Sequence, residues 1–214
     1  MNGGDVRRVL VLYGTTEGQT RRVAIELGIA LQRFGVEAHI FMASPSAPGP
    51  GRYAGVIVAA SLHAGKYQRS VREWLETHAV ALASKPGAFI SVCLMARDPR
   101  QETQLRLVAI MRDFVDSCGW MPAYLKPVAG ALVYTQYGWL TRWFMKRMAA
   151  RTGGDTDTSR DYEYTDWTDV RAFAREFAAF APSRSTAKRS DYGRPNTEHP
   201  TPPTISHPSH FARE

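Results

Sequence analysis

Residues 14–20, with the sequence Gly-Thr-Thr-Glu-Gly-Gln-Thr, join an apolar run to a segment with helical spacing. Small hydroxyl side chains and glycines at a helix start form a phosphate cradle, because backbone N–H groups and the helix dipole both point at the ligand. The loop has no lysine and matches neither the GxxxxGK(S/T) loop of ATP and GTP sites nor the GxGxxG dinucleotide fingerprint. It predicts a phosphomonoester held by neutral donors, with an ordinary helix-capping turn as the alternative.

Two further segments carry candidate residues at the ends of apolar runs. Ser61, Leu62, His63 and Tyr67 follow one run, and residues 91–97 (Ser91, Val92, Cys93, Leu94, Met95, Ala96 and Arg97) end the next. No Ser/His/Asp or Cys/His pairing stands at convincing positions, and we expect Cys93, in mid-strand, to be a buried and unreactive thiol. With only two cysteines, Cys93 and Cys118, we expect no disulfide framework and no metal site.

Alternating strand and helix patterns surround these segments. Apolar runs predict strands at residues 7–13, 36–42, 54–61, 87–95 and 124–134, and helical spacing predicts helices at 20–34, 66–83, 101–118 and 165–181. Strict alternation indicates an α/β fold, an open and mostly parallel sheet with helices on both faces. Ligands bind beyond the carboxyl ends of such strands, so we expect the loops after the first, third and fourth strands to meet in one site.

The chain of 214 residues is basic, with 27 Lys and Arg against 20 Asp and Glu and a formal charge of +7. This charge favours an anionic partner and argues against a carrier that docks through an acidic face. Residues 138–151 contain four cations and no acid, and Trp139, Arg142, Trp143, Lys146 and Arg147 are typical of a segment that meets anionic lipid or a carboxylate-bearing substrate. The alternative is a helix packed on the sheet with a solvated basic rim.

The last 33 residues, 182–214, hold 6 of the 13 prolines and show no helical or strand period. We expect this Pro-rich tail to be disordered, because it cannot bury enough apolar surface to offset its ordering entropy. No secretory signal stands at the start, and no apolar run approaches the ~20 residues that span a bilayer. These features predict a cytoplasmic protein whose membrane contact, on the inner face of the cell membrane, is peripheral. The positive charge alone would also suit a nucleic-acid partner, but no sequence motif supports nucleic-acid binding.

The loop at residues 14–20 resembles the phosphate loop of the flavodoxins, in both its residues and its place between the first strand and the first helix. The resemblance implies a flavodoxin-like fold with five parallel strands and FMN as cofactor. Thr15, Thr16, Gly18, Gln19 and Thr20 fall where that family holds the FMN phosphate. Glu17 departs from the pattern, which usually has a hydroxyl there, and it would contribute only its backbone N–H.

Further motifs narrow the resemblance. Residues 60–67, 91–97, 129–134, 153–158 and 164–167 resemble, in matching order, the menaquinone-dependent protoporphyrinogen IX dehydrogenases, bacterial flavodoxin-like enzymes of haem biosynthesis. The similarity covers about residues 7–180. It implies oxidation of protoporphyrinogen IX to protoporphyrin IX, with electrons passed through FMN to a membrane quinone, menaquinone or ubiquinone. It also implies an FMN domain at residues 1–181 with a long-chain insert at 134–158 near the fifth strand, before the tail.

The resemblance assigns roles at the flavin ring. The loop after the third strand would form one wall of the ring pocket through Ser61, Leu62, His63 and Tyr67, and residues 91–97 would meet the pyrimidine side. His63 would be a candidate proton carrier, and Arg97 would stabilise negative charge on the flavin. The alternatives are a plain loop residue or the start of the next helix at His63 and Tyr67, and, at Arg97, an ion pair with Asp98 or a helix cap.

Two other function classes compete with this enzyme. The first is a flavodoxin-type electron carrier, which the positive net charge fits poorly because such carriers are usually acidic. The second is a flavin-dependent NAD(P)H:quinone reductase, for which no second nucleotide fingerprint appears in the chain. The sequence leaves the oligomeric state open, with a homo-oligomer among the alternatives, and it leaves the identity of the quinone open as well.

Overall fold

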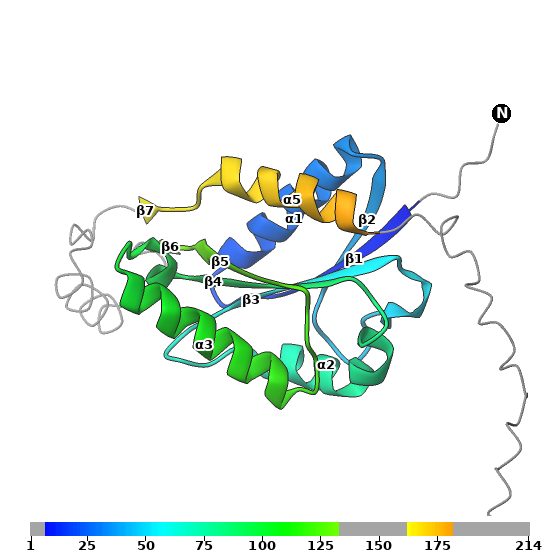
Figure 1. Ribbon diagram of the computed structural model, residues 1–214, viewed down its shortest axis with the longest axis horizontal. Coiled ribbons are helices and arrows are strands. Elements are labelled where there is room, and N and C mark those ends of the chain that lie inside the picture. The colour runs from blue at the N-terminus through cyan, green and yellow to red at the C-terminus, as the bar shows by residue number, and fades with distance from the viewer. Residues whose placement is uncertain (1–6, 133–161, 182–214) are drawn as a thin grey trace, which may run out of the picture.

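The computed structural model describes residues 7–132 and 162–181. In this part of the chain, strands and helices alternate as the sequence predicts, around one central sheet (Figure 1). The strands are β1 (Arg7–Gly14), β2 (Val36–Met42), β3 (Gly55–Ser61), β4 (Gly87–Cys93), β5 (Tyr124–Ala129), β6 (Ala131–Leu132) and β7 (Tyr162–Glu163). The helices are α1 (Gln19–Arg33), α2 (Arg69–Leu82), α3 (Gln101–Ser117) and α5 (Trp167–Phe180), with the short 3-10 turns η1 (Pro50–Arg52) and η2 (Leu94–Arg97).

The five long strands form a parallel sheet in the order β2-β1-β3-β4-β5. Strand β4 is buried along its whole length, and β3 is buried except for its last residue. Their nearly continuous apolar sequences follow from this position, because helices cover both faces of a central parallel strand. The expected open, five-stranded parallel sheet is confirmed.

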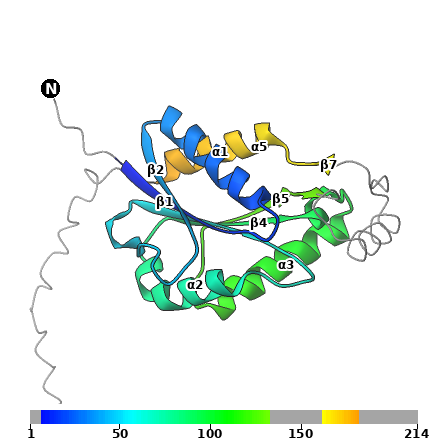
Figure 2. The same ribbon diagram turned by 180° about the vertical axis from the view of Figure 1, so that it is seen from behind.

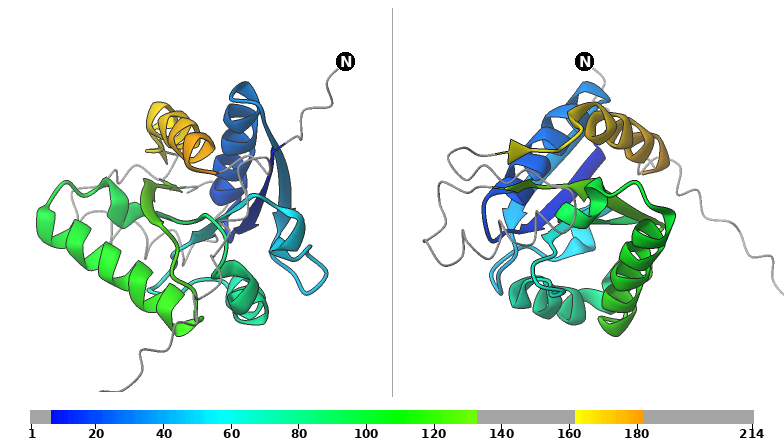
Figure 3. Two further views of the ribbon diagram at one scale, coloured as in Figure 1. Left: turned by 45° about the vertical axis from the view of Figure 1, so that its right-hand side comes forward. Right: turned by 90° about the vertical axis from the view of Figure 1, so that its left-hand side faces the viewer.

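Two layers of helices enclose the sheet (Figures 2 and 3). Helices α1 and α5 pack with Val9 and Val11 on one face, and α2 and α3 pack with Leu10 and Leu12 on the other. Successive side chains of a strand point to opposite faces, so β1 contributes to both cores in strict alternation. This packing leaves the carboxyl ends of the strands to emerge together at one edge.

Several boundaries differ from the predicted ones for local reasons. Helix α2 begins at Arg69 rather than near residue 66, because His63 and Lys66 close a tight turn with reciprocal backbone hydrogen bonds of 3.0 and 2.9 Å. The expected fifth strand, 124–134, is divided at Gly130 into β5 and β6, and β6 pairs antiparallel with β7. The predicted fourth strand ends two residues early, where η2 begins.

The predicted last helix is confirmed, and its cap is settled. The Asp166 carboxylate accepts hydrogen bonds from the N–H groups of Thr168 and Asp169, at 2.8 and 3.1 Å. Thr165, the residue before Asp166, is buried. The proposed insert at 134–158 and the tail at 182–214 lie outside the described residues.

Candidate functional site

A cavity of about 270 Å³ lies where the loops after β1, β3, β4 and β5 meet. Five of the six residues predicted for the phosphate loop line it, namely Thr15, Thr16, Glu17, Gln19 and Thr20. Three of the residues predicted after β3 and four of those predicted after β4 also line it, namely Ser61, Leu62, His63, Val92, Cys93, Leu94 and Met95. Residues separate in the sequence therefore gather at the predicted edge of the sheet, because parallel strands all end there.

The phosphate loop, residues 14–18, leaves the start of α1 open to a ligand. Gly18 has a left-handed backbone with φ of 88°, and its N–H donates to the Thr15 hydroxyl at 2.9 Å. No side chain caps the first turn of α1, and no acid lies within that turn. The first N–H groups of a helix have no acceptor inside the helix, so they are free to bind an anion here.

Thr20 gives the strongest local sign of a ligand. Its side chain is fully buried and lines the cavity, and its hydroxyl has no hydrogen-bond partner among the described residues. A buried hydroxyl without a partner costs free energy that an acceptor on a ligand would recover. A phosphate oxygen at the start of α1 would be such an acceptor, so the residues present fit the phosphomonoester group of FMN.

Gln68 connects the phosphate loop to the loop after β3. Its amide nitrogen donates to the hydroxyl of Thr16 at 3.0 Å and to the hydroxyl and carbonyl of Ser61. The hydroxyls of Thr16 and Ser61 are also 3.3 Å apart. We name Gln68, Thr16 and Ser61 the Gln68 bridge.

Gly14 lets α2 approach closely, because a Cβ there would lie 2.4 Å from Val71 Cγ2.

The loop after β3 makes a sharp turn beside the cavity. Ala64 and Gly65 both have positive φ, 48° and 76°, within the tight turn that His63 and Lys66 close. Left-handed backbone is costly for alanine, and such strain is kept where the surrounding structure imposes it. The turn places Leu62 and His63 on the cavity wall.

Tyr67 does not line the cavity and packs instead in the core between β4 and α3. Its hydroxyl donates to Ser91 at 2.9 Å, and its ring centroid lies 5.2 Å from that of Phe89 and 4.4 Å from that of Phe114. Burial raises the pKa of the Tyr67 phenol. These contacts give Tyr67 and Ser91 a packing role, and the predicted contact of both residues with a flavin ring stays a prediction.

The loop after β4 forms the opposite wall. The backbone N–H of Leu62 donates to the carbonyl of Val92 at 3.0 Å, which ties the two walls together. Burial raises the pKa of the Cys93 thiol, so this wall residue is a protonated thiol near neutral pH, as the sequence predicts. Ala96 does not line the cavity, and neither does Gly18 of the phosphate loop.

Arg97 lies beside the cavity rather than in its wall. Its guanidinium is 4.2 Å from the centre of the Tyr164 ring, just after β7. Asp98, one alternative partner of Arg97, binds Arg100 Nε at 2.9 and 3.0 Å and accepts from the Thr103 hydroxyl at 3.0 Å. These hydrogen bonds, those from Arg100 first, hold the pKa of the Asp98 carboxyl well below its usual range.

Four lining residues were not predicted from the sequence, namely Ala64, Gly65, Gly130 and Ala131. Gly130 and Ala131 follow β5, the fourth strand to end at this edge, and the same reasoning about strand ends would have found them. Glu163 and Thr165 were also missed. They hold the side chain of Gln19, and although Thr165 belongs to the motif at residues 164–167, that motif did not assign it a contact with Gln19.

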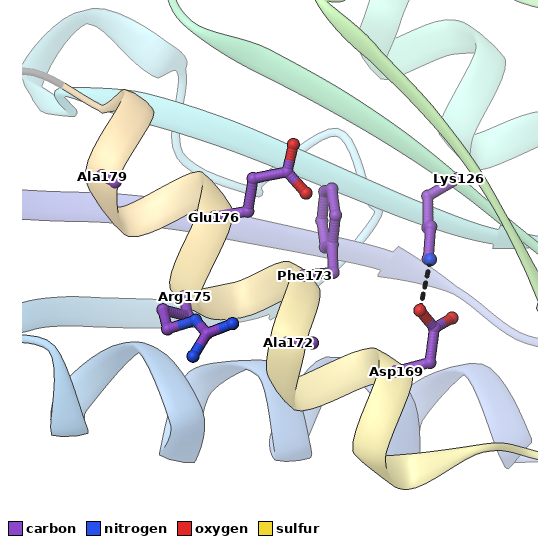
Figure 4. A pocket seen from close by; sticks show the side chains of 7 residues that line it. All are labelled: Lys126, Asp169, Ala172, Phe173, Arg175, Glu176 and Ala179. Atoms are coloured by element: carbon purple, nitrogen blue, oxygen red, sulfur yellow. Dashed lines mark hydrogen bonds and ion pairs between the residues drawn. The ribbon is translucent and has the colours of Figure 1, made fainter.

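A second hollow, of about 550 Å³, lies between α5 and the edge strand β5 (Figure 4). Its Lys126 and Asp169 point toward one another and form an ion pair of 2.7 Å. No buried side-chain polar atom without a partner lines it among the described residues. This hollow lies away from the carboxyl ends of the strands, where ligands bind in such folds, so the cavity of about 270 Å³ is the candidate site.

Other predicted features lie beyond the described part of the chain. Trp139, Arg142, Trp143, Lys146 and Arg147 fall in residues 133–161, which the structure does not describe. In the described ranges, 7–132 and 162–181, no helix is long and apolar enough to cross a membrane. The same ranges contain no cluster of three or more His, Cys, Asp or Glu side chains placed to bind a metal ion.

Comparisons with known proteins agree with the fold. A flavodoxin domain model matches residues 10–159. Protoporphyrinogen IX dehydrogenase (quinone) of Escherichia coli K12 is 36% identical over 172 residues, which cover 80% of this chain and 94% of that protein. The Leishmania major protein of the same name is 29% identical over 192 residues, covering 86% of this chain and 83% of its own length.

Solved structures carry the same architecture. A flavodoxin from Pseudomonas aeruginosa superposes with a TM-score of 0.51 at 17% identity, covering 81% of this chain and 98% of the flavodoxin. At this identity the likeness establishes the flavodoxin-like fold alone, with its parallel sheet in the order β2-β1-β3-β4-β5. By the domain match and by the extended identity to the E. coli protein, the chain belongs to the flavodoxin-domain family and, within it, to the family of the protoporphyrinogen IX dehydrogenases (quinone).

Proposed function

We propose that the protein is an FMN-dependent protoporphyrinogen IX dehydrogenase that oxidises protoporphyrinogen IX to protoporphyrin IX with a quinone as electron acceptor. The observation that carries this proposal is the identity of 36% along 94% of the E. coli protein with that name. The cavity at the strand ends supports it, because its open helix start and the unpaired Thr20 hydroxyl suit a phosphomonoester.

The cofactor, when bound, supplies the electron-accepting chemistry that no side chain offers. Its phosphate would be held by the hydroxyls of Thr15, Thr16 and Thr20 and by the backbone N–H groups of Glu17 and Gln19. Its ring would lie between Leu62 and His63 on one side and residues 92–95 on the other. The apolar side chains of both walls would exclude water from the ring.

The roles of two further side chains belong to the same proposal. His63 is exposed at the cavity wall, where its imidazole would carry protons between the porphyrinogen and solvent. Arg97 adds positive charge next to the site, and its place over Tyr164 fixes the guanidinium near the end of β7.

Peripheral attachment to the inner face of the cell membrane is part of the proposal as well. It would let the site exchange electrons with a membrane quinone, and it rests on the composition of residues 138–151, with four cations, no acid and two tryptophans. The protein would then be cytoplasmic and would meet anionic lipid through this segment.

The proposed reaction can be tested on the full chain loaded with FMN and held without oxygen. Protoporphyrinogen IX should bleach the flavin absorbance near ~450 nm, roughly where protein-bound flavins absorb, and an added quinone should restore it. Protoporphyrin IX, the product, serves as the matched control and should leave the absorbance unchanged. Bleaching by NAD(P)H alone, with no response to protoporphyrinogen IX, would overturn the proposal in favour of a nicotinamide-dependent reductase.

A further inference from the structure

The chain returns to the site at residues 162–167, after the long stretch that the structure does not describe. Strand β7 pairs antiparallel with β6, and the N–H of Tyr164 donates to the carbonyl of Gly130 at 3.1 Å. This pairing brings Glu163 and Thr165 beside the first residue of α1, from which they are separated by 144 and 146 positions in the chain.

Gln19, the first residue of α1, is fully engaged by this return segment. Its side chain is 8% exposed, and its amide nitrogen donates to Glu163 Oε1 and to Thr165 Oγ1, both at 2.8 Å. Its amide oxygen accepts from Arg22 Nη1 at 3.1 Å. The Thr165 hydroxyl in turn donates to the carbonyl of Ala129 at 2.7 Å. We name Gln19, Glu163, Thr165 and the Ala129 carbonyl the Gln19 bridge.

The Gln19 bridge contacts the first turn of α1, where the positions of the hydrogen-bond donors determine how well a phosphate is bound. Gln19 stands between Gly18, whose left-handed backbone starts the helix, and Thr20, whose buried hydroxyl has no partner among the described residues. The orientation of the first helical turn therefore depends on where the Gln19 side chain is held. Because that side chain has both nitrogen protons and its oxygen occupied, it is not available to bind the phosphate itself.

We propose that Glu163 and Thr165 are positioning residues for the phosphate group of the cofactor, acting through Gln19. The pairing of β7 with β6 places Glu163 and Thr165 where they hold Gln19, and so orients the first turn of α1. The affinity of the site for the phosphate then depends on two residues that do not contact the phosphate. This inference rests on the proposed function, since it presupposes FMN in the cavity.

Charge alone predicts the opposite effect of Glu163. Its carboxylate lies near a site for an anion, although Arg22 pairs with it at 3.1 Å. If Glu163 acted only through its charge, its removal would strengthen the binding of FMN. If it positions Gln19, its removal weakens FMN binding. The sign of the change separates the two explanations.

The test is a fluorescence titration of the full chain, stripped of flavin, with FMN and with riboflavin, which lacks the phosphate. Thr165→Val removes one acceptor of Gln19 and the donor to Ala129, and it should raise the Kd for FMN about tenfold, because the first turn of α1 is then held less firmly. The Kd for riboflavin should stay within about twofold, since the ring walls are untouched. Thr165→Ser keeps the hydroxyl and should restore FMN binding.

Glu163→Ala, at an exposed position, should weaken FMN binding in the same selective way.

Several outcomes would overturn the inference. Equal loss of FMN and riboflavin binding in Thr165→Val would show a purely structural role. An unchanged Kd for FMN, or tighter binding in Glu163→Ala, would contradict positioning, and Glu163→Ala decides the matter if Thr165→Val does not fold. If the unaltered protein binds no FMN, the proposed function fails and this inference with it. Normal binding by the unaltered protein with no change in the variants overturns this inference alone.

Discussion

The Gln68 bridge and the Gln19 bridge hold the two sides of the phosphate loop in different ways. The first joins Thr16 to residues 45 and 52 positions away, whereas the second spans 144 and 146 positions. The Gln68 bridge lies between elements of the parallel sheet and α2, so it forms once those elements pack. The Gln19 bridge also needs β7 to return after residues 133–161. The side of the phosphate loop held by the Gln68 bridge thus follows from the parallel architecture. The side held by the Gln19 bridge depends on where β7 lies.

The two bridges differ in burial as well. Gln19 and Thr165 are 8% and 9% exposed, whereas Thr16 is exposed and Gln68 is partly exposed. Water can replace a hydrogen bond lost at an exposed position, but not one lost in the interior. The Gln19 bridge should therefore contribute more to stability, although it depends on a longer chain closure.

The largest expected effect comes from forcing the Gln68 bridge apart. Gly14→Ala places a Cβ 2.4 Å from Val71 Cγ2 and 2.9 Å from Gln68 Oε1, so α2 must move. We expect a loss of about 3 kcal/mol in the free energy of unfolding, measured in urea. Gly18→Ala is the matched control, since its Cβ meets nothing within 4 Å and only the backbone φ of 88° is strained, at about 1 kcal/mol. Equal losses would mean that α2 does not pack closely on Gly14.

Removing each amide in turn compares the bridges directly. Gln19→Leu loses three hydrogen bonds, the one to Thr165 fully buried, and sets an apolar side chain against Glu163, so the free energy of unfolding should fall by about 2 kcal/mol. Gln68→Leu should cost less than about 1 kcal/mol, because water reaches Thr16 and because Gln68 Oε1 is already buried without a partner among the described residues. Chemical denaturation of both variants measures the difference, and a larger loss in Gln68→Leu would reverse our ranking.

Thr20 follows Gln19 in the chain, and its substitution should change ligand binding and protein stability in different ways. Thr20→Val replaces an unpartnered hydroxyl with a methyl group of similar volume, so the stability of the flavin-free protein should stay the same or rise. The Kd for FMN should increase about tenfold, because one donor to the phosphate is lost. Parallel melting and flavin titrations test both halves, and unchanged FMN affinity would show that Thr20 does not face the phosphate.

The smallest expected effect is a pH dependence of stability that comes from Asp98, just before α3. Unlike the neutral amides of the two bridges, Asp98 carries a charge. The pKa of Asp98 lies below its ordinary value of 3.8 because of hydrogen bonds from Arg100. Ionised Asp98 therefore stabilises the fold above that value, and this contribution is lost as the pH falls below it. Asp98→Asn should lower stability slightly at about pH 7, and the difference should be smaller at about pH 3, because the contribution is lost only as the pH falls through the lowered pKa of Asp98. Denaturation at both pH values checks this, and a constant difference would argue against the shift.

Much of the fold follows from local patterns that the sequence displays. The apolar runs of β3 and β4, the helical spacing of α1 and the Gly/Thr loop between β1 and α1 each predict an element correctly, and strand order then places their ends together. The prediction left open how Tyr67 is oriented, because spacing in a loop does not tell whether a ring turns toward the cavity or into the core, where it packs against Phe89 and Phe114. It also missed Glu163 and Thr165, whose partner Gln19 lies far away in the chain.

By itself, the sequence determined the order of strands and helices, the loop that suits a phosphate and the three loops that should form the site. These depend on side-chain periodicity and backbone preference, which act over a few residues. Only the tertiary structure decided which side chains line the cavity, which hydroxyl is left for a ligand and how β7 holds the start of α1. Those features are hydrogen bonds and packing contacts between distant segments, and their geometry exists only after the sheet and its helices have assembled.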